Sequence, residues 1–161
     1  EVSLSIKSDK QIIDQLDGGD PPPKILLAED SSIVRDLLKG ILEDGGFDVV
    51  SFNNGKQAWE YVSEWKQKAT TSGTSISNYV QMILTDIEMP QMDGHSLLRK
   101  IKEDEVLQQT PVILFSSLIY EEVRRKGDLL GADAQISKPE IGNLLNIVED
   151  VLKENNDAGK K

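Results

Sequence analysis

The sequence predicts an α/β fold, a doubly wound five-stranded parallel sheet with helices on both faces. Two observations favour it: short continuous apolar runs, and longer segments between them whose apolar residues recur at helical spacing. Short continuous runs are typical of strands that are buried on both faces of a parallel sheet. The alternation of run and segment repeats five times, as expected of a sheet built from βα units.

The first part of the predicted domain contains two strands, each followed by a helix. A strand over 24–28 precedes a helix from Ser31 to Asp44, which ends at a pair of glycines. A second strand over 48–52 leads through a short turn into a helix that carries Ala58, Trp59, Val62 and Trp65. The segment from Gln67 to Tyr79 is rich in Ser and Thr and predicts a long loop.

The second part continues the same alternation. Its predicted elements are a strand ending at Asp86, a helix from His95 to Glu103, a strand that begins after Pro111, a helix from Glu121 to Leu130, a strand ending at Lys138 and a helix from Ile141 to Leu152. His95 is the only histidine and is predicted to lie on the surface, and both tryptophans are predicted to pack in the interior.

Three segments are predicted along the chain. Residues 1–23 form an N-terminal extension that ends in the proline-rich linker Pro21-Pro22-Pro23, residues 24–153 form the domain, and residues 154–161 form a polar tail. Because the first residue is Glu1 and a linker precedes the domain, the chain is expected to be a fragment of a longer protein.

Composition excludes several functional classes. The formal net charge of -10 and the pI of about 4.6 argue against nucleic-acid binding. The absence of cysteine excludes disulfides and thiolate chemistry and fits a cytoplasmic protein. No apolar stretch approaches the roughly 20 residues that span a bilayer, so no membrane association is expected.

Reactive polar residues follow four of the five predicted strands. They are the acidic pair Glu29-Asp30, then Asp86, Ser116 and Lys138. The carboxyl ends of parallel strands share one edge of the sheet, where open α/β sheets bind ligands. Three carboxylates at one place require a cation, and an amine beside them indicates that an anionic group also binds there. The set predicts Mg²⁺ and phosphoryl chemistry.

These residues lie in segments that resemble the receiver domain of two-component response regulators, and the resemblance extends from Lys24 to Leu152. The matching segments are Leu27-Ala28-Glu29-Asp30-Ser31-Ser32, Thr85-Asp86-Ile87-Glu88-Met89-Pro90-Gln91-Met92-Asp93-Gly94, Phe115-Ser116-Ser117 and Lys138-Pro139. Each is weak alone, but all four occur in the family's order and at strand ends. The resemblance implies the flavodoxin-like strand order 2-1-3-4-5.

The resemblance also implies the role of each site residue. Asp86 is the phosphoacceptor, Ser116 bonds the phosphoryl group, and Lys138 follows its charge. Asp30, Asp86 and the backbone carbonyl of Glu88 bind Mg²⁺ directly, and Glu29 acts through water. Asp30 could instead cap the first helix. Such a domain is a phosphorylation switch that promotes its own phosphorylation and dephosphorylation, and not an enzyme in the usual sense.

Three positions affect how the resemblance is applied. Gln135 stands where the family usually carries an aromatic switch residue, so the expected coupling between hydroxyl and ring must be altered or absent. Ser117 replaces a common alanine. Glu88, two residues after the phosphoacceptor, is predicted to give the phosphorylated state an unusual lifetime.

The domain also looks similar to the C-terminal receiver of CheV-type chemotaxis coupling proteins. That similarity implies a histidine kinase as donor, and a chemotaxis receptor–kinase complex or a CheW-like domain of the parent chain as partner. A receiver of a hybrid histidine kinase or a stand-alone response regulator remains an alternative. A small-molecule-binding flavodoxin-like domain is disfavoured because Glu29-Asp30 would repel phosphate. A degenerate receiver is disfavoured by the complete set of acids, hydroxyl and lysine.

Overall fold

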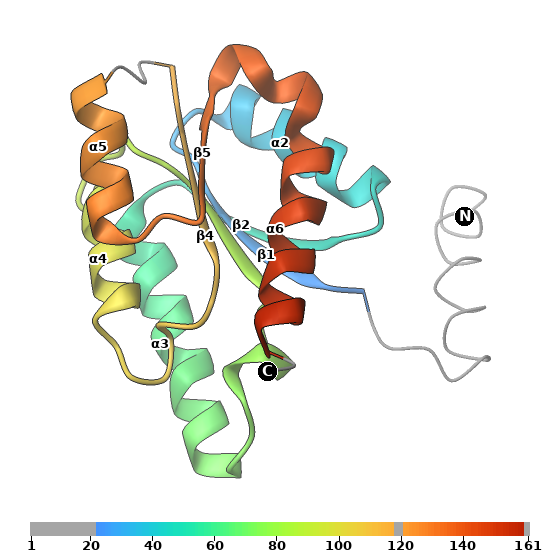
Figure 1. The fold of residues 1–161 in the computed structure, drawn as a ribbon, viewed down its shortest axis with the longest axis vertical. Helices are drawn as coiled ribbons and strands as arrows, with labels where there is room; N and C mark the ends of the chain where they lie inside the picture. Colours follow the sequence, from blue (N-terminus) through green and yellow to red (C-terminus); the bar gives the residue numbers. More distant parts are fainter. Residues whose placement is uncertain (1–21, 118–120, 160–161) are drawn as a thin grey trace.

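The computed structural model describes residues 22–117 and 121–159 as an α/β domain (Figure 1). Its strands are β1 (Lys24–Ala28), β2 (Asp48–Phe52), β3 (Met82–Asp86), β4 (Val112–Ser116) and β5 (Ala134–Ser137). Its α-helices are α2 (Ser32–Asp44), α3 (Gly55–Ser72), α4 (Gly94–Lys102), α5 (Glu121–Leu130) and α6 (Leu144–Gly159). Two 3₁₀ helices, η1 (Ile76–Asn78) and η2 (Lys138–Asn143), complete the described elements.

The sheet is parallel and its order is β2-β1-β3-β4-β5, so the predicted fold and strand order are confirmed. β1 and β3 lie in the middle and are buried along almost their whole length. That burial explains why their sequences are continuously apolar rather than alternating. The direction in which successive strands are added to the sheet reverses between β1 and β3, and a doubly wound sheet opens its ligand site at such a point.

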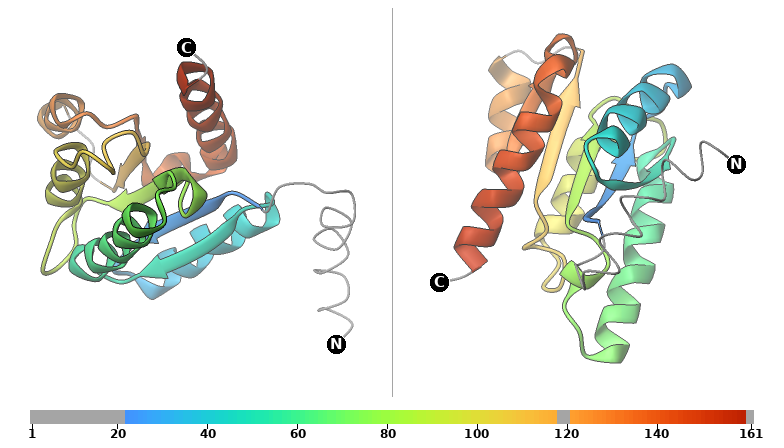
Figure 2. Two further views of the ribbon diagram at one scale, coloured as in Figure 1. Left: turned by 90° about the horizontal axis from the view of Figure 1, so that it is seen from below. Right: turned by 90° about the vertical axis from the view of Figure 1, so that its right-hand side faces the viewer.

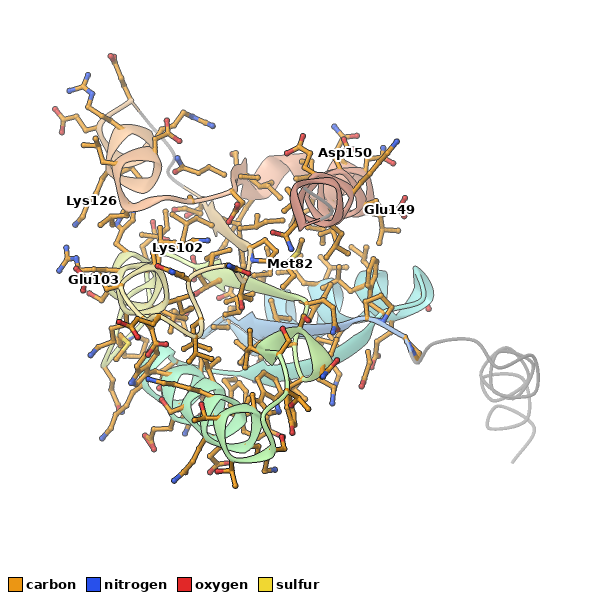
Figure 3. The ribbon with its side chains drawn as sticks, turned by 60° about the horizontal axis from the view of Figure 1, so that its bottom comes forward. Met82, Lys102, Glu103, Lys126, Glu149 and Asp150 are labelled. Atoms are coloured by element: carbon orange, nitrogen blue, oxygen red, sulfur yellow. The ribbon has the colours of Figure 1, made fainter. Side chains whose placement is uncertain are left out.

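Two helical layers cover the sheet, and each encloses a separate apolar core. α2 and α6 pack on one face and α3, α4 and α5 on the other, which is seen from three directions (Figures 1 and 2). Met82 of β3 is fully buried beneath α2 and α6, whereas Glu149 and Asp150 lie on the exposed side of α6 (Figure 3). The amphipathic pattern of each helix thus determines its side of the sheet.

Three helices begin at a side-chain cap. Ser31, Asn54 and Asp93 each accept a hydrogen bond from the backbone N–H three residues further on, at 3.3, 2.8 and 2.7 Å respectively. These caps satisfy donors that a helix N-terminus otherwise leaves free. The cap of α2 is therefore Ser31, and the alternative in which Asp30 serves only as a helix cap is wrong.

The predicted loop over 67–79 is wrong in its first half. α3 continues to Ser72 and ends at Gly73, whose φ of 68° is the left-handed conformation typical of a helix C-terminus. Ala69 is buried one turn beyond the buried Trp65, so the apolar face persists through the Ser and Thr residues. Helical spacing on one face determines this segment more strongly than the low helix propensity of the exposed positions.

The last helix is also longer than predicted. α6 ends at Gly159 rather than Leu152, so most of the segment predicted as a polar tail over 154–161 is helical. The predicted N-terminal extension over 1–23 lies outside the described residues except for Pro22 and Pro23. Within the described ranges, no helix combines the length and the apolar character that a membrane crossing requires.

Candidate functional site

The carboxyl ends of four strands meet at one edge of the sheet. Strand register places Ala28 beside Thr85, Asp86 beside Phe115, and Ser116 beside Ser137. Because the strands are parallel and nearly level, the residues that follow them converge above the sheet. The predicted residues at 29–30, 86, 116 and 138 are brought to this edge together.

The acidic pair Glu29-Asp30 follows β1, and its two members differ in exposure. The side chain of Glu29 is fully buried, whereas that of Asp30 is exposed. Glu29 Oε2 accepts a 2.9 Å hydrogen bond from the backbone N–H of Ser31, and the backbone N–H of Glu29 donates to Phe52 O at 3.0 Å. Glu29 is therefore held within the fold, and Asp30 faces the solvent at the mouth of the site.

Arg35 supports the acidic pair and was not predicted from the sequence. Its Nη1 donates to the backbone carbonyl of Glu29 at 2.8 Å and lies 3.5 Å from that of Asp30. A guanidinium on the first turns of α2 thus holds the backbone that carries both acids. The sequence feature that could have indicated this role is the position of Arg35, five residues after Asp30. This spacing places the arginine on the turn of α2 that faces the β1–α2 connection.

Asp86 lies at the end of β3 with only 1% of its surface exposed. Glu29, Asp30 and Asp86 each offer a carboxylate oxygen within 4.8 Å of the others. Asp86 Oδ1 is buried, and no group of the described residues donates a hydrogen bond to it. Burial, and next the charge of Glu29, raise the pKa of Asp86 to about 8, although Lys138 opposes the shift. A buried, unpaired oxygen within an acidic cluster fits a hard divalent cation such as Mg²⁺.

Lys138 brings a positive charge to the cluster from the end of β5. Its Nζ lies 3.0 Å from Glu29 Oε1 and 3.6 Å from Asp86 Oδ2. Burial opposes the charged form, but the hydrogen bond to Glu29 and the charge of Asp86 outweigh it and raise the pKa of Lys138. The ammonium is therefore positioned beside the carboxylate that is predicted to accept the phosphoryl group.

Ser116 and Glu88 meet above the ends of β4 and β3. The Ser116 hydroxyl, which is fully buried, donates to Glu88 Oε1. The backbone N–H of Ile87 donates to Phe115 O at 3.1 Å and keeps the two strand ends together. The predicted phosphoryl-binding hydroxyl therefore has a carboxylate as acceptor, an arrangement that the sequence did not predict.

The loop after Asp86 is packed closely against the next helix. Gly94 begins α4 and its N–H donates to Ile87 O at 2.9 Å. A Cβ at Gly94 would lie 2.2 Å from the backbone oxygen of Asp86. A residue without a side chain is therefore required where the helix touches the strand end. Gln91, with a φ of 68°, lies at the tip of the same loop.

Gln135 stands where the family usually carries an aromatic ring, and its side chain forms hydrogen bonds to α5. Its Nε2 donates to the backbone carbonyl of Arg124 at 2.7 Å and to Asp128 Oδ1 at 2.8 Å, both on α5. A Cβ at Gly127 would lie 2.4 Å from Gln135 Oε1. The side chain thus links β5 to the outer helix. Ser117, the other departure from the family pattern, is exposed.

The predicted surface position of His95 is wrong. The imidazole is 6% exposed and lies at the first turn of α4, where α4 packs beside α5. Burial first, and then the charge of Lys126, lower the pKa of His95. A histidine next to a glycine gives no periodic signal of its own, and the contact with α5 is set by tertiary packing. Trp65 is buried as predicted, and Trp59 is partly buried with Lys100 Nζ 5.3 Å from its ring centroid.

Residues 25–149 match the response regulator receiver domain. The chain belongs to the response regulator receiver family. Receiver domains accept phosphoryl groups from histidine kinases. In this receiver, three carboxylates and the Lys138 ammonium lie together at the strand ends.

Curated relatives of this receiver include regulators from plants and bacteria. The rice (Oryza sativa subsp. indica) two-component response regulator ORR11 is 37% identical over 100 residues, covering 62% of this chain and 60% of the relative. Response regulator Rre1 of Synechocystis sp. is 32% identical over 119 residues, covering 73% of this chain and 46% of the relative. The matched region thus spans three fifths or less of these relatives' lengths.

Solved structures with the same fold include receivers of histidine kinases. The receiver of a signal transduction histidine kinase from Syntrophus aciditrophicus is 30% identical with a TM-score of 0.68, covering 82% of this chain and 91% of that one. The receiver of the histidine kinase CKI1 from Arabidopsis thaliana, in complex with Mg²⁺ and BeF₃⁻, is 26% identical with a TM-score of 0.71, covering 80% and 89%.

Proposed function

We propose that this receiver takes a phosphoryl group from a histidine kinase onto Asp86 and thereby changes a protein-interaction surface. The observation that supports this most strongly is the position of the Asp86 carboxylate, which is buried beside both the acidic pair and the Lys138 ammonium. A nucleophile, a cation site and a mobile positive charge are the components that phosphoryl transfer to a carboxylate needs.

The transfer itself forms one bond and breaks one. A carboxylate oxygen of Asp86 bonds to phosphorus as the P–N bond of the donor phosphohistidine breaks, and the bonding pair remains on the imidazole nitrogen. Lys138 is close enough to move with the charge from the carboxylate to the phosphoryl oxygens, and Ser116 donates to one of those oxygens. The product is an acyl phosphate on Asp86. The domain therefore promotes its own phosphorylation, and the attached phosphoryl group switches its conformation.

Asp30, Asp86 and the backbone carbonyl of Glu88 would hold Mg²⁺, and Glu29 would act through water. When bound, the ion offsets negative charge on the carboxylates and the phosphoryl oxygens. The receiver of CKI1 in complex with Mg²⁺ and BeF₃⁻ supports this assignment by analogy. A bound cation would oppose the raised pKa of Asp86, because a neighbouring positive charge favours the anionic form that acts as the nucleophile.

The mass of the intact protein after incubation with acetyl phosphate tests this function. We expect a phosphoryl adduct that requires Mg²⁺ and is lost in Asp86→Asn. Asp150→Asn is the matched control, since it makes the same change on the exposed side of α6. An adduct that persists in Asp86→Asn would place the acceptor elsewhere, and the absence of any adduct with a histidine kinase as donor would contradict the function.

Within this function, the role in chemotaxis signal coupling is the more specific proposal. The segment from Glu88 to Gly94 and the length of the chain between β2 and β3 support a CheV-type parent, in which this receiver follows a CheW-like domain in a cytoplasmic receptor–kinase complex. Reconstituted arrays of receptor and kinase test it: the parent protein should change kinase activity, and Asp86→Asn in the parent should abolish the phosphorylation-dependent part.

A receiver of a hybrid histidine kinase is the second candidate. The similarity to histidine kinase receivers from Syntrophus aciditrophicus and Arabidopsis thaliana favours it. The sequence of the parent gene upstream of Glu1 distinguishes the two, because a kinase core and a CheW-like domain have different motifs. A stand-alone response regulator is the third arrangement, in which neither precedes the receiver.

A further inference from the structure

We propose that Glu88 is a positioning residue that holds the Ser116 hydroxyl in the unphosphorylated receiver and competes with the phosphoryl group for it. This inference rests on the proposed function and extends it to a residue pair. The observation behind it is the hydrogen bond from the Ser116 hydroxyl to Glu88 Oε1. Ser116 is fully buried at the end of β4, whereas Glu88 is exposed on the loop after β3.

The competition follows from the chemistry of the two acceptors. A serine hydroxyl carries one proton and donates one strong hydrogen bond at a time. Glu88 offers a carboxylate, and a phosphoryl group on Asp86 would offer charged oxygens of similar acceptor strength. Ser116 must therefore leave Glu88 before it can bond the phosphoryl group. The proton stays on the hydroxyl throughout, and only its acceptor changes.

The backbone around Ser116 is held in place, so the change of hydrogen-bond acceptor from Glu88 to the phosphoryl group affects only the end of β4. β3 and β4 are held level at this edge by the register of Asp86 with Phe115 and by the hydrogen bond from Ile87 N–H to Phe115 O. Ser116 is the last residue of β4, and the chain continues from it toward α5. Release of the hydroxyl from Glu88 is therefore positioned to act at the start of the β4–α5 connection.

A direct consequence is that Glu88 stabilises the unphosphorylated state. A ligand shifts a two-state equilibrium only by its difference in affinity for the two states. The Glu88–Ser116 hydrogen bond belongs to one state and is lost in the other, so it lowers the affinity of the site for a phosphoryl group. Glu88 also places a negative charge near the phosphoryl group. The effect of this charge on affinity must be separated from the effect of the hydrogen bond to Ser116.

Binding of beryllofluoride, a phosphoryl mimic, in the presence of Mg²⁺ tests the proposal by calorimetry. Four proteins form a cycle: wild type, Glu88→Ala, Ser116→Ala and the double variant. We expect Glu88→Ala to tighten binding about 10-fold in the wild-type background, and the gain to shrink to about 2-fold when Ser116→Ala is present. Glu88→Gln, which keeps an acceptor but removes its charge, should give a smaller gain than Glu88→Ala.

Glu103→Ala removes the same charge at the far end of α4 and should leave the affinity unchanged. An equal gain in both backgrounds would show that Glu88 acts by charge alone and would overturn the inference while leaving the proposed function intact. Failure of the wild-type protein to bind beryllofluoride would overturn the proposed function and this inference with it.

Discussion

The side-chain amide of Gln135 occupies the space in which residue 127 would carry a Cβ, since a Cβ at Gly127 would lie 2.4 Å from Gln135 Oε1. Gln135 Nε2 donates to the backbone of Arg124 and to the Asp128 carboxylate. One polar side chain therefore connects β5 to α5 where receivers usually carry an aromatic ring. The glycine in α5 is what allows this close approach.

The contact between Gln135 and Gly127 predicts that Gly127→Ala destabilises the wild-type protein but stabilises a protein that already carries Gln135→Ala. Gly127→Ala should lower the free energy of unfolding by about 1 kcal/mol: two hydrogen bonds of about 1 kcal/mol each are lost, and alanine returns about 1 kcal/mol of helix propensity. In a Gln135→Ala background the same change should raise it by about 1 kcal/mol, because nothing obstructs the methyl group. Urea denaturation of the four proteins measures both values.

Gly40 supplies the control for this cycle. It lies inside α2, and a Cβ there would meet no atom within 4 Å. Gly40→Ala should therefore raise the free energy of unfolding by about 1 kcal/mol in either background. Stabilisation by Gly127→Ala in the wild-type background would mean that the contact with Gln135 carries no energetic weight.

Gly94→Ala should be more damaging than Gly127→Ala. A Cβ at Gly94 would lie 2.2 Å from Asp86 O and 2.9 Å from Ile87 Cα, and backbone atoms cannot turn aside as a side chain can. We expect a loss of about 2–3 kcal/mol, together with weaker Mg²⁺ binding, because the strand end that carries Asp86 must move. Urea denaturation and calorimetry measure the two effects. Unchanged stability would contradict the close packing of α4 against this strand end.

Asp86→Asn should stabilise the metal-free receiver in a pH-dependent way. Burial and the charge of Glu29 raise the pKa of Asp86 from 3.8 to about 8. The folded state therefore retains a proton that the unfolded chain releases, and the free energy of unfolding of the wild-type protein falls as pH rises between these two values. Asparagine does not titrate, so the advantage of the variant should grow from about pH 4 to about pH 8 and then level off.

Urea denaturation of both proteins in EDTA, across this pH range, measures the difference. Added Mg²⁺ should narrow it, because the cation favours the charged carboxylate in the wild-type protein. A difference that stays constant with pH would show that the pKa of Asp86 is close to its ordinary value.

Lys138→Met should weaken the metal-free fold and strengthen Mg²⁺ binding. The ammonium lies 3.0 Å from Glu29 Oε1 and 3.6 Å from Asp86 Oδ2, so its loss leaves two buried carboxylates without their cation. We expect a loss of about 1–3 kcal/mol, less than for a fully buried pair because Lys138 is partly exposed. Mg²⁺ affinity should rise about 10-fold, since the ion no longer competes with the positive charge of the lysine.

The exposed pair Arg125–Glu121 provides the comparison. Its atoms are 3.1 Å apart and both side chains are mostly exposed, so Arg125→Met should change stability by at most about 0.5 kcal/mol and leave Mg²⁺ affinity unaltered. Chemical denaturation and calorimetry of the two variants measure these effects. A fall in Mg²⁺ affinity in Lys138→Met would indicate that the lysine helps to shape the cation site rather than compete for it.

Most of the fold could be predicted because strand burial is recorded in local composition. β1, β3 and β4 each contain a continuous apolar run, and a polar residue at or just after the end of each strand breaks the pattern. The helix boundaries were less predictable. α3 and α6 run on through Ser, Thr and Asn residues, because one apolar face packed against the sheet stabilises a helix whose exposed positions favour other conformations.

The sequence by itself determined which reactive residues this receiver has and that they meet at one edge. Parallel strands place their carboxyl ends together, so the residues after each strand converge whatever the details of packing. Tertiary structure alone decided that Ser116 donates to Glu88, that Arg35 holds the acidic pair, that Gln135 lies against Gly127 and that His95 is buried. These contacts mostly join separate elements, and their geometry depends on how the helices pack on the sheet, which no local pattern encodes.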